Sequence, residues 1–119
     1  MIDAAARLRA LGPQAVLLKG GHLVKGAESV DVLDDGGEPL TLAAPRIRTA
    51  NTHGTGCTLS SAIAALLARG LPLRAAVREA KVYVTTAIRA ADRLNVGHGQ
   101  GPVHHFYALW REEADELLA

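Results

Sequence analysis

The sequence of 119 residues contains a single cysteine, one tryptophan, one phenylalanine and two tyrosines. One cysteine excludes an intramolecular disulfide framework and a metal site built from several thiolates. The net charge of +1 gives no electrostatic basis for binding nucleic acid or an anionic membrane. So few aromatic side chains do not form a base-stacking surface.

Long apolar runs are also absent, because charge or glycine interrupts each one well before the roughly 20 residues of a membrane span. Asp3 and Arg7 stand where a signal peptide would be purely apolar. These absences predict a soluble, cytoplasmic protein that binds neither nucleic acid nor membrane. What remains is an ordinary globular composition, 49% hydrophobic and 21% charged, in a length that allows one domain.

The first part of the chain predicts a helix followed by short strands. Residues 3–11 are rich in alanine, Asp3 is placed to cap that helix, and Gly12 with Pro13 ends it. The first strand is a continuous apolar run, typical of a strand buried on both faces. The next two alternate around the glycine-containing residues 35–38, which is typical of a hairpin. The strands are expected at residues 15–19, 29–34, 39–42 and 46–49.

The second part predicts helices. From Thr55 onward the apolar residues recur every three or four positions, which is the period of an amphipathic helix. Gly70 ends the first helix, and Pro72 fits the first turn of the next. Helices are expected at residues 55–69, 72–94 and 105–118, with a glycine-rich loop at 97–102. The order of elements predicts an α/β fold, a sheet with helices packed on it.

The stretch from Asn51 to Thr58 is the most informative about chemistry. Two glycines flank Thr55 directly before the apolar helix, so the chain turns tightly and brings its N–H groups close to a ligand. The helix adds unpaired N–H donors and the positive end of its dipole, which together suit a phosphate. The same dipole favours the thiolate form of Cys57. The residues alone leave open that the glycines only shape a loop and that Cys57 is a small buried side chain.

Three segments, in the same order along the chain, resemble one known family. The segment from Thr52 to Ala64 resembles the signature of hydroxymethylpyrimidine/phosphomethylpyrimidine kinases, which have the ribokinase-like fold. The segments Val16 to Leu23 and Val96 to Phe106 resemble a strand–loop motif and a C-terminal segment of the same family. The resemblance implies the C-terminal portion of a ribokinase-like αβα sandwich, with residues 1–119 forming a single partial domain.

The resemblance also implies a reaction. These kinases transfer the γ-phosphoryl group of ATP, with Mg²⁺, to hydroxymethylpyrimidine and then to its phosphate, in thiamine diphosphate synthesis. Gly54, Thr55, Gly56 and Cys57 are then the anion hole for the ATP phosphates, and Cys57 is the catalytic base that accepts the proton of the substrate hydroxyl. Lys19 is the cation near a phosphate.

Two further residues follow from the resemblance, Lys81 and Val84, which lie on a helix that borders the nucleotide. An apolar stripe on that helix also explains Val84 as a core residue. The N-terminal half of the family, which carries the pyrimidine pocket and an Asn-x-x-Glu motif that organises Mg²⁺, has no counterpart here. The partners implied are therefore ATP, a small pyrimidine, and either a missing N-terminal half or a second copy.

Alternatives stay open. One alternative is a nucleotide- or phosphate-binding fragment without kinase turnover. Another is a pyridoxal-type kinase of the same superfamily. His53 beside Cys57 invites a Cys–His hydrolase, but such a dyad needs an orienting third group. His98, His104 and His105 are better explained by loop packing than by a metal site, since no carboxylate or second thiol accompanies them. No metal ligands are assigned.

Overall fold

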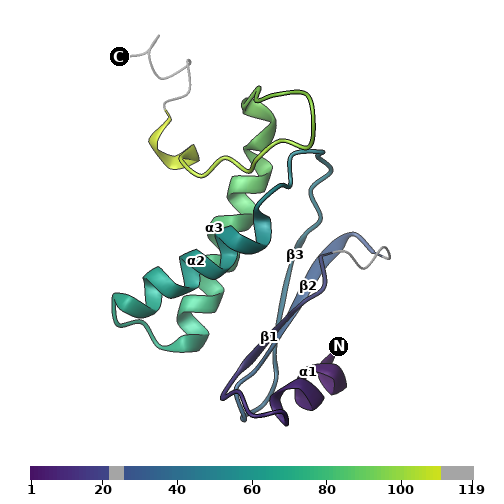
Figure 1. Ribbon diagram of the computed structural model, residues 1–119, viewed down its shortest axis with the longest axis vertical. Helices are drawn as coiled ribbons and strands as arrows, with labels where there is room; N and C mark the ends of the chain where they lie inside the picture. The colour runs from purple at the N-terminus through teal and green to yellow at the C-terminus, as the bar shows by residue number, and fades with distance from the viewer. Residues whose placement is uncertain (22–25, 111–119) are drawn as a thin grey trace. The chain divides into compact units, whose positions relative to one another are not determined.

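The computed structural model describes residues 1–21 and 26–110. The chain divides into two compact units, Met1–Arg46 and Ile47–Ala119, each with its own helices or strands (Figure 1). No helix in the described ranges is long and apolar enough to cross a membrane. Each unit is built largely as the local sequence predicts, with corrections at the ends of elements.

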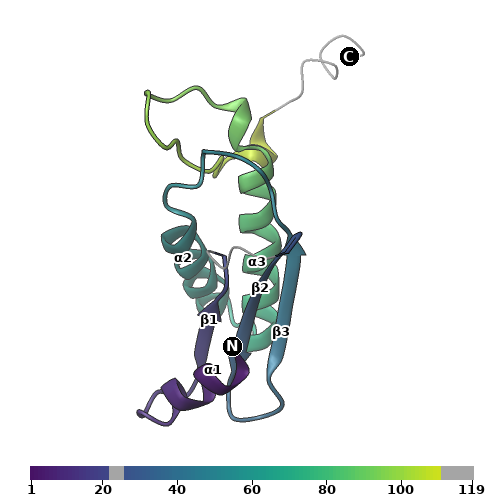
Figure 2. The ribbon, with the colours of Figure 1, turned by 90° about the vertical axis from the view of Figure 1, so that its right-hand side faces the viewer.

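The first unit is one helix packed on a three-stranded antiparallel sheet (Figure 2). Its elements are α1 (Ile2–Arg9), β1 (Val16–Lys19), β2 (Glu28–Asp34) and β3 (Leu40–Pro45). The strands pair in the order β1-β2-β3, and α1 packs against β1 and β2. Ala5, on the side of α1 that faces the sheet, is fully buried. Its small side chain lets the helix pack closely against the strands.

The predicted hairpin is confirmed. β2 and β3 pair in register from Glu28 opposite Pro45 to Leu33 opposite Leu40. Gly36 in the turn has φ +92°, a conformation that favours glycine, and its amide donates to Asp34 Oδ1 at 3.0 Å.

Two predictions for the first part of the chain are wrong in detail. Asp3 does not cap α1, since Met1 occupies the N-cap position and Asp3 lies within the first turn. β1 is not a strand buried on both faces, because its residues are half-buried or, at Lys19, exposed. It pairs antiparallel with β2, as neighbours in this sheet all do, whereas a continuous apolar run is typical of a buried parallel strand.

The expected strand at residues 46–49 does not form, because β3 ends at Pro45. Arg46 instead extends its guanidinium to three carbonyl oxygens, those of Gly21, Gly26 and Glu28, at 2.6 to 3.3 Å. The backbone leaves the sheet at Arg46, whose side chain is held by these three carbonyl groups.

The second unit contains two packed helices, α2 (Thr55–Ala68) and α3 (Leu73–Arg89), joined by a short turn at Gly70 (Figure 1). The predicted apolar stripe lies on the buried side of α3: Val77, Ala80, Val84 and Ala87 are buried, Ile88 is half-buried, and Ala76 is buried beside them.

The ends of the later helices differ from the sequence expectation. α3 ends at Arg89, five residues earlier than predicted, and a 3₁₀ turn follows at Ala91–Arg93. Residues 105–110 form no α-helix but a 3₁₀ turn at Tyr107–Leu109, and the rest of the expected final helix lies outside the described residues.

Candidate functional site: the N-terminal end of α2

The turn before α2 has the geometry that its glycines predict. Gly54 is the N-cap of α2 with φ +79°, while a Cβ there would meet nothing within 4 Å. The glycine is therefore required by the backbone conformation rather than by crowding. The turn is held by Thr55, whose hydroxyl donates to the Thr52 carbonyl at 2.7 Å, and by the Thr58 amide, which donates to the Gly54 carbonyl at 2.8 Å.

The backbone amides of Gly56 and Cys57, which follow Thr55, are available to a ligand. Within the described residues, no hydrogen-bond acceptor is recorded for the backbone N–H groups of Gly56 and Cys57. They belong to the first turn of a 14-residue helix, where donors are unpaired and the helix dipole is positive. This is the arrangement that binds an anion. The Cys57 side chain is exposed, so the alternative of a small buried thiol is wrong.

A second segment, far along the chain, lies against this turn. The His53 amide donates to the Gly101 carbonyl at 3.0 Å, and His53 forms a parallel bridge with Pro102. Gln100 Nε2 donates to Thr52 Oγ1 at 2.7 Å. The structure thus brings together the two segments, around residues 52–58 and 97–106, that carry most of the family resemblance in this unit.

Asn51 and Asp92 secure that contact and were not assigned a role from the sequence. The Gly101 amide donates to Asn51 Oδ1 at 3.1 Å, and Asn51 Nδ2 donates to Asp92 Oδ1 at 2.9 Å. Asp92 also accepts a hydrogen bond from the hydroxyl of Thr49. The partners of Asn51 lie 41 and 50 residues away, so the local sequence does not predict these contacts. The position of Asn51 at the start of the motif was the only signal of its role.

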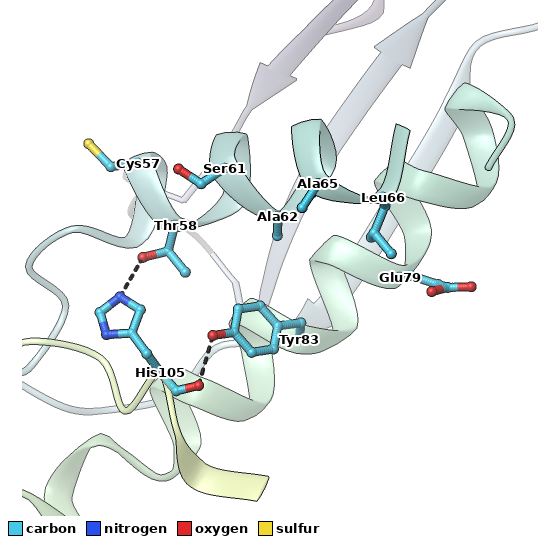
Figure 3. A pocket seen from close by; sticks show the side chains of 9 residues that line it. All are labelled: Cys57, Thr58, Ser61, Ala62, Ala65, Leu66, Glu79, Tyr83 and His105. Atoms are coloured by element: carbon cyan, nitrogen blue, oxygen red, sulfur yellow. Dashed lines mark hydrogen bonds between the residues drawn. The ribbon is translucent and has the colours of Figure 1, made fainter. Parts of the chain in front are cut away.

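An open groove of about 660 Å³ runs along α2 from its N-terminal end (Figure 3). Cys57 lies at one end and Glu79 at the other, with apolar side chains between them. His105 Nε2 lies 2.9 Å from the hydroxyl of Thr58, and the Tyr83 hydroxyl donates to the His105 carbonyl at 2.8 Å. The lining residues are Cys57, Thr58, Ser61, Ala62, Ala65, Leu66, Glu79, Tyr83 and His105.

The Tyr83 hydroxyl, which lines this groove, is a weaker acid than an ordinary tyrosine. Desolvation by burial, and to a smaller extent the neighbouring Tyr107, raises the pKa of Tyr83 above its usual value of 10.0. The rings of the two tyrosines are 5.9 Å apart. Tyr83 is therefore a neutral hydrogen-bond donor to the segment around His105 at physiological pH.

The remaining predicted site residues belong to other elements. Lys19 ends β1 in the first unit, where its side chain is exposed. Lys81 and Val84 lie on α3, the first half-buried and the second buried, as the apolar stripe requires. In the ranges that the structure describes, no group of three or more His, Cys, Asp or Glu side chains is arranged to hold a metal ion.

Comparison with known proteins adds independent evidence. The sequence model of the phosphomethylpyrimidine kinase family matches residues 1–104. A hydroxymethylpyrimidine/phosphomethylpyrimidine kinase of Rhizobium meliloti is 54% identical over 112 residues, which cover 94% of this chain and 42% of that protein. A thiamine biosynthesis bifunctional protein of Geobacter sulfurreducens is 56% identical over 108 residues, 91% of this chain and 21% of that protein.

Among solved structures, a pyridoxal kinase of Bacillus subtilis in an ADP complex is similar, with a TM-score of 0.84 and 37% identity. The match covers 92% of this chain and 40% of that one. The predicted fold class, the C-terminal portion of a ribokinase-like α/β fold, is confirmed. The chain spans about two fifths of the length of the single-function relatives that it matches.

Proposed function

We propose a phosphoryl-transfer function for this chain, which belongs to the phosphomethylpyrimidine kinase family. The reaction is the ATP-dependent phosphorylation of hydroxymethylpyrimidine or its phosphate on the route to thiamine diphosphate. The observation that carries the proposal is the N-terminal end of α2, where an exposed thiol stands beside two backbone amides without acceptors in the described structure.

In this proposal the amides and the thiol act together. The N–H groups of Gly56 and Cys57 hold the negative charge that develops on the phosphate oxygens, with Gly54 and Thr55 shaping the turn. Cys57 accepts the proton of the substrate hydroxyl while that oxygen forms its bond to the γ-phosphorus. The bond between the γ-phosphorus and the bridging oxygen breaks at the same time, and ADP leaves with its electron pair.

Other roles are assigned by the resemblance and await test. Lys19 is proposed to neutralise a phosphate, and Lys81 and Val84 to border the nucleotide. Mg²⁺, which accompanies ATP in such kinases, is given no ligand here, because the described residues contain no cluster that fits a metal ion. No step above depends on it.

Pyridoxal is the second candidate substrate, because the solved structures that match most of the chain include pyridoxal kinases with bound ADP or AMP-PCP. The curated relatives at 54% and 50% identity are pyrimidine kinases, which favours the pyrimidine. A panel with both substrates separates the two candidates.

The test is ADP release by the chain with ATP, Mg²⁺ and hydroxymethylpyrimidine phosphate, compared with Cys57→Ala. We expect the substitution to lower turnover by about 10²-fold or more, the usual contribution of a general base, while the affinity for ADP changes little. Measurable and equal turnover in both proteins would remove Cys57 as the base. ADP binding without any transfer would favour the non-catalytic binding fragment.

A further inference from the structure

The first unit contains a buried carboxylate that has no role in the proposed reaction. Asp31 lies in the central strand β2 and is 2% exposed, next to the buried apolar residues Val32 and Leu33. Aspartate is unfavourable in strands, and a carboxylate loses its hydration when it is buried, so such a position needs a compensating contact. Asp31 Oδ1 accepts a buried hydrogen bond from the backbone amide of Gly20 at 3.0 Å. The contact joins the carboxylate to the residue that directly follows β1.

This contact lies where the backbone pairing of β1 ends. Lys19 opposite Asp31 is the last pair between β1 and β2, while β2 continues alongside β3 beyond that pair. The two residues after Lys19 are held by side chains instead. Asp31 holds the amide of Gly20, and the Arg46 guanidinium donates to the carbonyl of Gly21 at 2.6 Å. The end of β1 is therefore fixed by contacts that the strand pairing does not supply.

Packing restricts Gly20 in addition to the hydrogen bond. Gly20 is buried, and a Cβ added to it would overlap the carbonyl oxygen of Val30. That Cβ would also lie 3.0 Å from the terminal methyl carbon of Met1. The Val30 oxygen belongs to the backbone of the central strand, which cannot move away without disturbing the sheet, so this close approach requires glycine. The first peptide after Lys19 is thus fixed by two independent contacts with β2.

The orientation of that peptide sets the part of the backbone from which the Lys19 side chain projects. The Gly20 N–H and the Lys19 carbonyl share one planar peptide group, so a hydrogen bond to the N–H fixes the backbone torsion ψ of Lys19. Residues directly opposite each other in an antiparallel pair place their side chains on the same face of the sheet. Lys19 and Asp31 are such a pair, yet they form no ion pair among the described residues. The carboxylate holds the backbone and does not neutralise the lysine opposite it.

We propose that Asp31 is a positioning residue for Lys19. It fixes the backbone that directs the lysine to a phosphate group and leaves the charge of the lysine for that phosphate. The proposal rests on the proposed function, in which Lys19 neutralises a phosphate. Asp31 contacts neither nucleotide nor substrate in this role, and it accepts no proton. The contacts that carry the proposal all lie inside the first unit, Met1–Arg46.

The first test measures the hydrogen bond itself and needs no nucleotide. Asp31→Ala removes the acceptor and should speed hydrogen–deuterium exchange of the Gly20 amide, followed by NMR, at least about tenfold. Asp31→Asn keeps an acceptor oxygen and should restore most of the protection. Asp34→Ala is the matched control, because Asp34 is also buried in β2 and accepts an amide at 3.0 Å, but that of Gly36. Circular dichroism checks folding, and Asp31→Val, which suits a buried strand and lacks the acceptor, replaces an Asp31→Ala variant that does not fold.

The second test asks whether Asp31 acts through Lys19. Calorimetry measures the affinity for AMP-PCP, and Lys19→Met shows how much of that affinity the lysine charge supplies. We expect Asp31→Ala to weaken binding at least about fivefold, Asp31→Asn to restore it, and Asp34→Ala to bind like the unsubstituted chain. Adding Asp31→Ala to Lys19→Met should cause little further loss, because both changes remove the same interaction.

The variants separate failure of this proposal from failure of the proposed function. Unchanged exchange of the Gly20 amide in Asp31→Ala would overturn the role of Asp31 and leave that of Lys19 standing. Losses of affinity that add in the double variant would do the same, because Asp31 would then act independently of the lysine. If the unsubstituted chain does not bind AMP-PCP, or if Lys19→Met binds it equally well, the proposed role of Lys19 fails and that of Asp31 fails with it.

Discussion

Gly101 is the residue at which the structure makes its most specific prediction. A Cβ at this position would lie 2.2 Å from Asn51 Oδ1 and 2.9 Å from its Cγ. Neither distance is tolerated, so Gly101→Ala must displace the Asn51 side chain. Asn51 accepts from the Gly101 amide and donates to Asp92, and both hydrogen bonds would be lost.

The size of the effect follows from those contacts. Each hydrogen bond contributes about 1 kcal/mol net, and a buried donor left without a partner costs about 1–3 kcal/mol. Gly101 itself is buried. We expect Gly101→Ala to lower the free energy of unfolding of the second unit by about 2–4 kcal/mol. It should also weaken ADP binding, because the Gly101 carbonyl accepts a hydrogen bond from the His53 amide directly before the proposed anion site.

The assay is urea unfolding followed by the fluorescence of the single tryptophan. Trp110 lies in the second unit, with its ring 4.3 Å from that of His104, so it reports on the right part of the molecule. Gly99→Ala is the matched control in the same loop, because a Cβ there meets nothing within 4 Å. It should change the stability by less than about 0.5 kcal/mol.

A double-substitution cycle makes the reasoning refutable. Asn51→Ala removes the atoms that clash, so adding Gly101→Ala to it should cause little further loss of stability. Additive losses would show that the Asn51 side chain is not what excludes a Cβ at position 101. A Gly101→Ala variant as stable as Gly99→Ala would refute the described packing of this loop.

Further predictions address charge, acidity and packing. Gly56→Asp places a carboxylate among the proposed phosphate-binding amides and should weaken ADP binding at least about tenfold by calorimetry; unchanged affinity would argue against an anion site there. A tyrosine absorbance titration should show one group ionising above pH 10 that is missing in Tyr83→Phe. Because the pKa of Tyr83 is raised on folding, its stabilisation is complete below pH 10 and is lost as the pH rises through the higher value. Leu33→Ala, at a side chain 1% exposed, should destabilise the first unit by about 2–5 kcal/mol, measured by circular dichroism in urea.

The comparison of α2 with β1 shows which features local sequence specifies. The start of α2 was predictable because a positive-φ glycine and a 3.6-residue apolar period are both local properties of the chain. The hairpin of β2 and β3 was predictable for the same reason. The environment of β1 was not predictable, because a short apolar run looks the same in the sequence whether its strand pairs parallel or antiparallel.

The candidate site divides in the same way. The sequence by itself determined the turn and the start of α2 at which we propose anion binding, since the residues that form them are contiguous. Only the tertiary structure decided that Cys57 is exposed and that Gly101 and Asn51 meet beside that site. Contacts between residues 50 positions apart leave no periodic trace in the sequence, because they depend on how the intervening helices pack. The exposure of the Cys57 thiol likewise depends on which other segments pack against α2, and the sequence of α2 alone does not specify them.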